Sequence, residues 1–486
     1  MTDHAPLIER AFALATDEQA ADIEPIDGTL PDFLTGRYYV NGPARFSRGV
    51  LRYRNWLDGD GMVCALDFSR RPIRFTNRFV RSTKFTAEEA AGTAVYRTFG
   101  TAFPGDALLR GMALESPINV SVYWFNGHLL AFGEQSVPWE LDPQTLETKG
   151  PFRFRNQVNE ATPFSAHPKV DPATGEMFTF GVSFSSASPA LIVFRFGADG
   201  ALKYRRRVPL PYACSIHDFA LSQRYSIFHV APYLLDIAKV LHHGAALIDT
   251  LEWHPERGSR LIGVSRESGA LEWTIPAGHG YCLHVINAFE QGDHLIVDVV
   301  EYERPLYDQY QIVPDLFSQV SPGRPLRLDI DLRKGAIVDR RVIAYDRAPD
   351  FPAHDPELTG RPYDRFWMLG ISAAGQPGRK FFDELVAADW SDPEGRVDIY
   401  RCPRHHYLGG EPVFVPQRAG DSEGVVICQG FDAAACSSAF LVFDARHVSR
   451  GPVARLPLAS PIPLLFHAVF QAGEVAAPRR RSSSLS

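Results

Sequence analysis

The chain has 486 residues, of which 45% are hydrophobic, 12% aromatic and 22% charged. These proportions are typical of a folded globular protein and exclude a disordered or fibrous chain. The net charge of −7 argues against a nucleic-acid partner, because binding to phosphates requires a basic face. The sequence has no run of ~18 apolar residues, so we expect no membrane-spanning helix.

The N-terminus and the cysteines bear on the cellular compartment. Residues 1–24 carry Asp3, Glu9, Asp17 and Glu18 and have no basic stretch followed by an apolar core, so we expect no signal peptide. The six cysteines are dispersed and form no CxxC pair, a pattern typical of reduced thiols. Both features predict a cytoplasmic protein.

Short apolar runs rich in β-branched and aromatic residues recur along the chain and predict strands. In chain order they are Arg37–Val40, Ile73–Val80, Val120–Phe125, Met177–Phe184, Leu191–Phe196, His294–Glu301, Leu326–Ile330, Val425–Cys428 and Phe440–Phe443. Asn126-Gly127 lies between two such runs and predicts a hairpin, since both residues tolerate positive φ. Similar turns recur at irregular spacing. The pattern favours one large all-β array, a propeller first and a double sandwich as the alternative.

Two segments depart from this pattern. Leu234–Leu251 has helix-like spacing and few charges, which is compatible with a core-packed helix or with an apolar patch at an entrance or membrane surface. The stretch Asp58-Gly-Asp-Gly61 resembles part of a calcium loop but lacks the later acidic ligands, so we interpret it as a tight structural turn.

Familiar catalytic motifs are missing: the sequence has no Walker phosphate loop, no GxGxxG, no GxSxG and no HExxH. Among sixteen histidines, four begin or interrupt apolar runs, namely His167, His217, His284 and His467. A buried imidazole needs partners for both nitrogens, and a metal together with an outer acceptor supplies them. Four imidazoles without thiolates suit iron or copper better than structural zinc.

At these residues the chain resembles the carotenoid cleavage oxygenase family, which includes stilbene-cleaving dioxygenases and retinoid isomerases. The matching segments follow one another in order from about residue 25 to about residue 470. They are Asn41-Gly-Pro43, Asp58-Gly-Asp-Gly-Met62, Glu134 with Leu141–Thr148, His167–Glu176, His217-Asp-Phe219, His284–Ala288, Gly360–Tyr363, Gly410–Pro416 and Phe466-His467.

The resemblance implies a seven-bladed β-propeller with a loop and helix dome over an axial non-heme Fe(II). It implies three regions: an N-terminal segment 1–24, a single catalytic propeller domain 25–470, and a flexible basic, serine-rich tail 471–486. His167, His217, His284 and His467 would hold the iron. Glu134 would brace His217 and Glu411 would brace His467.

Two positions depart from the family pattern. Asp350 stands where the family has a glutamate that braces a histidine. Because aspartate is one methylene shorter, its reach to His284 would need a water bridge or a small backbone shift. Val120 aligns with a position where many members carry threonine near the metal, and an apolar group there would shield one coordination position.

The implied reaction is oxidative cleavage of a conjugated C=C bond by dioxygen to two carbonyl products, with no external reductant. Stilbene-cleaving relatives often carry lysine immediately before the first bracing glutamate, where this chain has Gly133. This difference favours a carotenoid or apocarotenoid over a stilbene or phenylpropanoid, which remains the alternative. Segment 234–251 lies where membrane-contacting members have an apolar patch, so peripheral membrane contact is also expected. An isomerohydrolase on the same site and a non-catalytic metal-bound propeller scaffold are the other interpretations.

Overall fold

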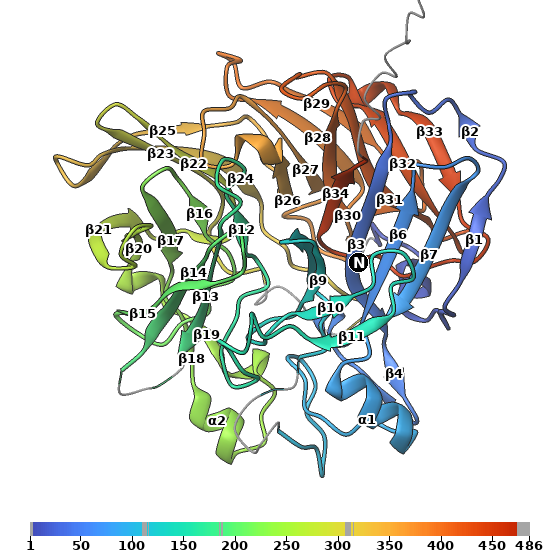
Figure 1. Cartoon of the computed structure of the whole chain (residues 1–486), viewed down its shortest axis with the longest axis horizontal. Helices are drawn as coiled ribbons and strands as arrows, with labels where there is room; N and C mark the ends of the chain where they lie inside the picture. The colour runs from blue at the N-terminus through green and yellow to red at the C-terminus, as the bar shows by residue number, and fades with distance from the viewer. Residues whose placement is uncertain are drawn as a thin grey trace, which may run out of the picture.

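The computed structural model describes residues 3–108, 114, 116–183, 185, 188–306, 313 and 315–473. Within this part of the chain, seven sheets of four or five antiparallel strands form the blades of a β-propeller (Figure 1). The predicted all-β propeller is therefore confirmed, and the double sandwich is wrong. Every predicted strand lies in a blade, except that Phe184 falls outside the described residues.

Five blades are four-stranded and follow the chain outward from the innermost strand, apart from one insertion in the third of them. The first two are β8 (Ser121–Phe125), β9 (His128–Phe132), β10 (Trp139–Leu141), β11 (Thr148–Pro151), then β12 (Lys169–Val170), β13 (Met177–Ser183), β14 (Ala190–Phe196), β15 (Leu202–Pro209). The third is β16 (Ala220–Leu221), β17 (Tyr225–Val230), β20 (Ser259–Ser265), β21 (Leu271–Gly278). The last two are β22 (Tyr281–Gln291), β23 (His294–Tyr302), β24 (Gly323–Asp331), β25 (Ala336–Val342), then β26 (Ala348–His354), β27 (Arg365–Ile371), β28 (Glu384–Asp389), β29 (Val397–Arg401).

The other two blades join the ends of the chain and close the ring. One contains β1 (Ala20–Ile23), β7 (Ile73–Phe79), β6 (Asp60–Asp67), β3 (Gly36–Arg45) and the C-terminal β34 (Ala468–Ala472). The other contains β2 (Asp27–Gly28), β33 (Pro452–Pro457), β32 (Ser437–Asp444), β31 (Gly424–Asp432) and β30 (His406–Pro416). The N-terminal segment does not stand apart, since β1 is the outermost strand of its blade. Of the expected tail, residues 474–486 lie outside the described residues.

Apolar side chains between neighbouring blades form the core. One cluster joins the two closing blades, and others lie between successive four-stranded blades. The alternation of strand residues places one apolar set on each face of a blade, so both faces are buried. The hairpin at Asn126-Gly127 forms as predicted, with φ of 50° and 78°, which are angles that Asn and Gly tolerate.

A dome of helices and small sheets gathers on one side of the propeller, low in Figure 1. It contains α1 (Thr83–Ala91), α2 (Ile237–His242) and the two-stranded sheets β4 (Ser47–Arg48) with β5 (Leu51–Arg52) and β18 (Tyr233–Leu235) with β19 (Leu251–Trp253). The described 3₁₀ turns are Ile8–Phe12, Trp56–Asp58, Ile248–Thr250, Pro255–Arg257, Pro356–Leu358 and Val448–Arg450.

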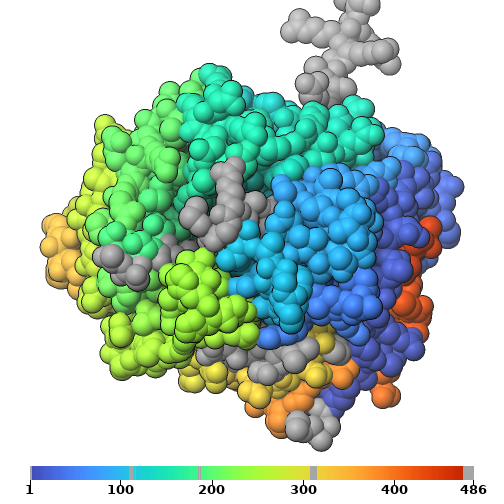
Figure 2. Space-filling view, turned by 90° about the horizontal axis from the view of Figure 1, so that it is seen from below, coloured from blue at the N-terminus to red at the C-terminus, as the bar shows by residue number. Residues whose placement is uncertain are grey.

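The segment Leu234–Leu251 is not one continuous helix, which corrects the helical interpretation. Only Ile237–His242 is α-helical, after Asp236 caps its N-terminus, and β18 and β19 pair on either side of it. Leu241 is 37% exposed, whereas Val240 is buried. In Figure 2 this region lies beside residues near α1, and Arg97 donates hydrogen bonds to the carbonyls of Val240 and Ala245. The segment is therefore part of the dome, with one apolar side chain turned outward.

Among the described residues, no helix has the length and apolar character needed to cross a membrane. The turn Asp58-Gly-Asp-Gly61 is structural, as expected. Asp58 accepts hydrogen bonds from the Gly100 N–H at 2.7 Å and the Thr101 hydroxyl at 2.6 Å. This carboxylate thus ties the dome loop that contains Gly100 and Thr101 to the start of β6.

Candidate metal centre

Four histidines that are far apart in sequence meet where the inner strands of four blades converge. His167 lies just before β12, His217 just before β16, His284 within β22 and His467 just before β34. One ring nitrogen from each lies within 4.8 Å of the others. Metal–nitrogen bonds of about 2.0–2.1 Å place opposite ligands about 4.2 Å apart, so the cluster has the dimensions of a site for one ion.

Carboxylates lie against the outward nitrogen of two of these histidines. Glu134 Oε1 is 2.5 Å from His217 Nδ1, and Asp350 Oδ1 is 2.6 Å from His284 Nδ1. Asp350 therefore makes direct contact, and no water bridge is needed for its shorter side chain. With Nδ1 engaged in this way, Nε2 is the nitrogen that each ring turns to the centre.

A third carboxylate lies beside His467. Glu411 Oε2 is 3.4 Å from His467 Nδ1 and accepts a hydrogen bond from the Ala468 N–H at 3.3 Å. Burial raises the pKa of Glu411 to about 7, because a carboxylate loses hydration in the interior. A cation at the centre would stabilise the charged form of this carboxylate.

Backbone bulges aim the functional side chains of three inner strands. A regular strand alternates its side chains between two faces, and a bulge turns one residue out of that alternation. The pairing register shifts around His284, Asp350 and Glu411. These shifts fall between Cys282 and Val285, between Asp350 and Ala353, and between Gly409 and Val413. In the second bulge Phe351 has φ of 50°, a backbone shift of the kind that lets Asp350 reach its histidine.

Hydrogen bonds fix the backbone of the first two histidines relative to each other. The Ser165 hydroxyl accepts from the His167 N–H at 3.1 Å and donates to the His217 carbonyl at 3.1 Å. The Nε2 atoms of these two rings are 2.9 Å apart. The sequence analysis did not identify Ser165, although it lies two residues before a candidate ligand.

The backbone of the last histidine is fixed by two of the motif segments. The His467 N–H donates to the Val120 carbonyl at 3.2 Å, and its carbonyl accepts from the Asn41 N–H at 3.0 Å. Gly42 allows this approach, because a Cβ at that position would lie 2.5 Å from the Leu465 Cα. Val120 is thus buried directly beside His467.

At His167 and His467 the surroundings favour the neutral imidazole, which is the form that binds a metal cation. Burial, followed by the neighbouring imidazoles, lowers the pKa of His167 and His467 well below the usual value. Burial alone would also lower the pKa of His284, but the Asp350 carboxylate outweighs it and raises that pKa. The His284 Nε2 is buried without a hydrogen-bond partner, and such an atom is costly unless a ligand completes it.

These observations fit a divalent transition metal. The group offers four nitrogens and no thiolate, and a carboxylate lies within 3.4 Å of Nδ1 in three of the rings. In metal sites, carboxylates so placed orient the histidine ligands and raise their basicity. The orphaned His284 Nε2 is the atom that a metal would satisfy. Among the histidines, cysteines and acidic residues that the structure describes, these four histidines form the group whose geometry suits an ion.

Aromatic side chains border the histidines on one side. The Phe351 ring lies 5.1 Å from the His467 ring and 6.0 Å from the Phe466 ring. Trp56 follows at 4.5 Å from Phe466, and its indole N–H donates to the Leu464 carbonyl. This wall places apolar, polarisable surface next to the candidate metal centre and excludes water from that side.

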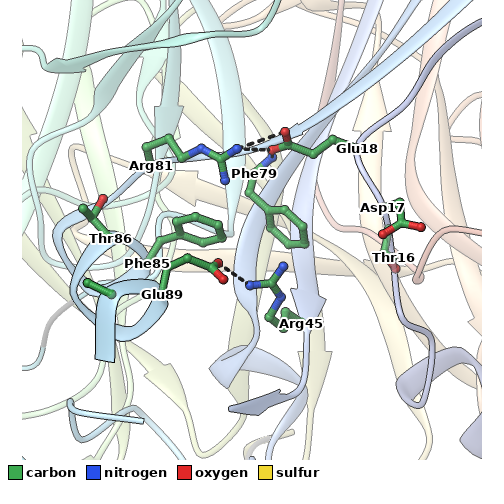
Figure 3. A pocket seen from close by; sticks show the side chains of 10 residues that line it. Thr16, Asp17, Glu18, Arg45, Phe79, Arg81, Phe85, Thr86 and Glu89 are labelled. Carbon is green, nitrogen blue, oxygen red and sulfur yellow. Dashed lines mark hydrogen bonds and ion pairs between the residues drawn. The ribbon is translucent and has the colours of Figure 1, made fainter. Parts of the chain in front are cut away.

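A surface groove of about 820 Å³ lies elsewhere, between α1 and the N-terminal segment. Figure 3 shows Arg81 paired with Glu18 and Arg45 paired with Glu89 across Phe79 and Phe85. Its charges thus neutralise one another in pairs, and none of its lining residues belongs to the histidine cluster. The groove is therefore a separate surface feature, and the candidate metal-binding groups lie at the propeller centre.

The fold and the cluster define a class: a seven-bladed propeller whose inner strands converge on four histidines, three of which lie against a carboxylate. The family model described as "Retinal pigment epithelial membrane protein" matches residues 12–472. The chain therefore belongs to this family, that of the carotenoid cleavage oxygenases, and the resemblance noted in the sequence is confirmed.

Individual relatives are oxygenases with different substrates in their names. The chain is 29% identical to an apocarotenoid-15,15'-oxygenase of Synechocystis over 92% of both chains. It is 28% identical to an isoeugenol monooxygenase of Pseudomonas nitroreducens, over 90% of this chain and 91% of that one. The solved structure of cobalt-substituted Synechocystis ACO has a TM-score of 0.87 at 27% identity, covering 97% of this chain and 100% of the other.

Proposed function

We propose that this chain is a non-heme Fe(II) dioxygenase that cleaves a conjugated C=C bond of an apolar substrate into two carbonyl products. The observation that carries the proposal is the convergence of four histidines, with one ring nitrogen of each within 4.8 Å of the others. His167, His217, His284 and His467 would be the ligands. When bound, Fe(II) supplies the dioxygen activation that alkene cleavage requires.

The protein's own residues position the reactants and exclude water. Glu134, Asp350 and Glu411 hold three of the ligand rings in one orientation through their Nδ1 atoms. Val120 lies beside His467 and would shield one side of a bound metal with an apolar group. No side chain acts as a general acid or base in this proposal, because the overall reaction moves no proton to or from the protein.

The reaction balances without a reductant. An alkene R–CH=CH–R′ and one dioxygen give R–CHO and R′–CHO: the σ and π components of the C=C bond and the O–O bond are broken, and each carbon forms one C=O bond. The aromatic wall of Phe351, Phe466 and Trp56 supports an apolar, conjugated substrate, since such rings stack on a π-system and repel water.

We infer that the substrate is a carotenoid or apocarotenoid. Gly133 is the supporting observation, because a Cβ there would lie 1.9 Å from the Ser116 hydroxyl and 3.0 Å from the Ile118 Cα. The backbone is too close for the lysine that stilbene-cleaving relatives often carry at this position. A stilbene or phenylpropanoid remains the second candidate, because the similarities of 29% and 28% to the two kinds of relative do not separate them.

Peripheral membrane contact through residues 234–251 belongs to the same proposal, because a long polyene dissolves in membranes. Leu241 supports it as an apolar side chain exposed on α2. In a cytoplasmic protein, such a residue can reach into the interfacial region of a bilayer.

The test is anaerobic reconstitution with Fe(II), followed by ¹⁸O₂ and a panel of an apocarotenal, a stilbene and isoeugenol. We expect two carbonyl products from the apocarotenal, with one ¹⁸O in each before exchange with water. His217→Ala is the matched control and should give no product. Preferential cleavage of the stilbene or isoeugenol would overturn the polyene assignment alone. Tight iron binding without turnover of any alkene would instead support the scaffold interpretation.

A further inference from the structure

An ion pair between half-buried Lys169 and buried Asp218 lies beside the histidine cluster and joins three inner strands. Lys169 Nζ in β12 lies 2.8 Å from Asp218 Oδ1, which precedes β16. The Val285 N–H in β22 donates to Asp218 Oδ2 at 2.9 Å. One carboxylate therefore connects three blades at their inner edges, through a charge on one side and a backbone hydrogen bond on the other.

Each member of this triad stands one or two positions after a candidate ligand. Lys169 follows His167 by two residues, Asp218 follows His217 by one, and Val285 follows His284 by one. Each histidine is therefore separated by only one or two residues along the chain from a group that contacts the Asp218 carboxylate or from Asp218 itself. Any shift of Asp218 moves the Cα atoms of these histidines relative to one another, and so changes the spacing of their ring nitrogens.

The Asp218 carboxylate is bound by protein donors and is not part of the group that could hold the ion. Its Oδ1 also accepts the Phe219 N–H at 2.8 Å, so both oxygens are occupied by protein donors. Its side chain is 3% exposed, and a buried carboxylate with these partners is held rigidly in place. It is therefore a tether for the strands and not a fifth ligand.

Lys169 separates an effect of charge from an effect of position. A cation close to a metal site opposes metal binding by Coulomb repulsion. An apolar residue at this position would avoid that repulsion. The geometry points to a positioning role: we propose that Lys169 and Asp218 hold His167, His217 and His284 at the spacing that one metal ion requires. This inference rests on the metal site of the proposed function.

The decisive variant is Lys169→Met, because the two explanations predict opposite signs. If only charge mattered, removing the cation would tighten metal binding. If the pair positions the histidines, the variant should bind Co(II) about 10-fold more weakly, the size of loss that outer-sphere changes produce. The Co(II) visible absorption spectrum should also change, since it reports ligand geometry. Titration of metal-free protein with Co(II) measures both.

Arg327 and Asp298 provide a matched control. They form another cation–carboxylate pair at 2.8 Å, with side chains 17% and 0% exposed, against 22% and 3% for Lys169 and Asp218. Asp298 lies in β23 and Arg327 in β24, further out in the blade that carries His284. Arg327→Met should lower the melting temperature but leave the Co(II) dissociation constant within twofold and the spectrum unchanged.

Unaltered or tighter Co(II) binding by folded Lys169→Met, with the wild-type spectrum, would overturn the inference. If that variant does not fold, Lys169→Gln decides in the same way, because glutamine is polar but is shorter and uncharged, so the ion pair with Asp218 is lost. For Lys169→Gln we expect weaker binding than wild type, while binding as tight as wild type would be the contrary result. Failure of the wild-type protein to bind metal would contradict the proposed function instead, so the two failures are distinguishable.

Discussion

Two buried polar clusters in this molecule differ in whether the protein itself supplies partners for their functional groups. Under α1, Lys84 pairs with Asp60 and with Glu88, each at 2.8 Å, and Arg48 pairs with Asp60 at 2.7 Å. At the propeller centre, three of the four histidines have a carboxylate at Nδ1, but the His284 Nε2 that faces inward is unsatisfied. The charges of the first cluster are all paired within it, although the Arg48 Nε makes no hydrogen bond, and we call it the closed cluster; the second cluster needs a ligand.

The difference shows how a structural cluster and a functional one can be told apart. Tyr53 adds a further hydrogen bond to Glu88 at 2.8 Å. Removing a charged member under α1 would leave the other buried charges with fewer partners, which destabilises the fold. In the histidine cluster the His284 Nε2 lacks a partner and the geometry suits an ion, so this cluster can bind a ligand. Stability should therefore depend mainly on the first cluster and metal binding mainly on the second.

The largest effect should follow from removing a candidate ligand. We expect His217→Ala, or alanine at His167, His284 or His467, to abolish iron binding and turnover, because one of four metal–nitrogen bonds is lost. Metal analysis and product formation are the measurements. Alanine at His229, His254 or His405 should leave both intact, and full activity of His217→Ala would show that the site is assigned wrongly.

Breaking the closed cluster should destabilise the fold without affecting metal affinity. Lys84→Met would leave Asp60 and Glu88 buried with Arg48 as their remaining cation, and the loss of a buried partner costs about 3–5 kcal/mol. Urea unfolding of the metal-free protein measures this change. A Co(II) dissociation constant that moved by more than twofold would contradict the separation of the two clusters.

The outer carboxylates should have an intermediate effect on the metal site. Glu134→Gln and Glu411→Gln keep the shape of the side chain but lose its charge, and we expect roughly 10–100-fold weaker iron binding or lower activity. Iron titration and steady-state kinetics measure the two quantities. Wild-type values in both variants would remove these residues from the bracing role, and the unfolding free energy serves as the control for general damage.

The smallest effect on stability should come from the exposed face of the dome, away from both clusters. Leu241→Asp replaces an exposed leucine, so the unfolding free energy should change by no more than ~0.5 kcal/mol. Co-sedimentation with vesicles should fall, because the lost side chain would have contributed about 1.5–3 kcal/mol in the bilayer. Unchanged vesicle binding would refute the membrane contact. Leu247→Asp is the contrasting variant, since Leu247 packs against the core and should destabilise the fold.

Local pattern was sufficient to predict the strands but not the segment in the dome. Runs such as Leu191–Phe196 became strands of the blades, and Asn126-Gly127 formed its hairpin. Leu234–Leu251 has a helical apolar pattern, yet pairing between β18 and β19 limits the helix to Ile237–His242. Tertiary pairing outweighed a weak local preference, because a six-residue helix gains little from its own hydrogen bonds.

The candidate ligands could be selected from the sequence through the resemblance and their apolar context, whereas their supports could not. Ser165, Lys169 and Asp218 are ordinary polar residues in the sequence, and their contacts join positions about 50 to 70 residues apart. The contact between Asp350 and His284 depends on the bulge at Asp350–Ala353. Side-chain length alone suggested a gap there.

The sequence by itself determined the all-β architecture and the four histidines, because strand patterns and motif residues are local properties of the chain. The tertiary structure alone decided which buried charges and ring nitrogens have partners within the protein. The closed cluster under α1 and the open His284 Nε2 both consist of buried polar residues, and only their spatial partners distinguish them. A hydrogen bond or an ion pair depends on distances within a few ångströms, and the ring of blades sets those distances between residues remote in sequence.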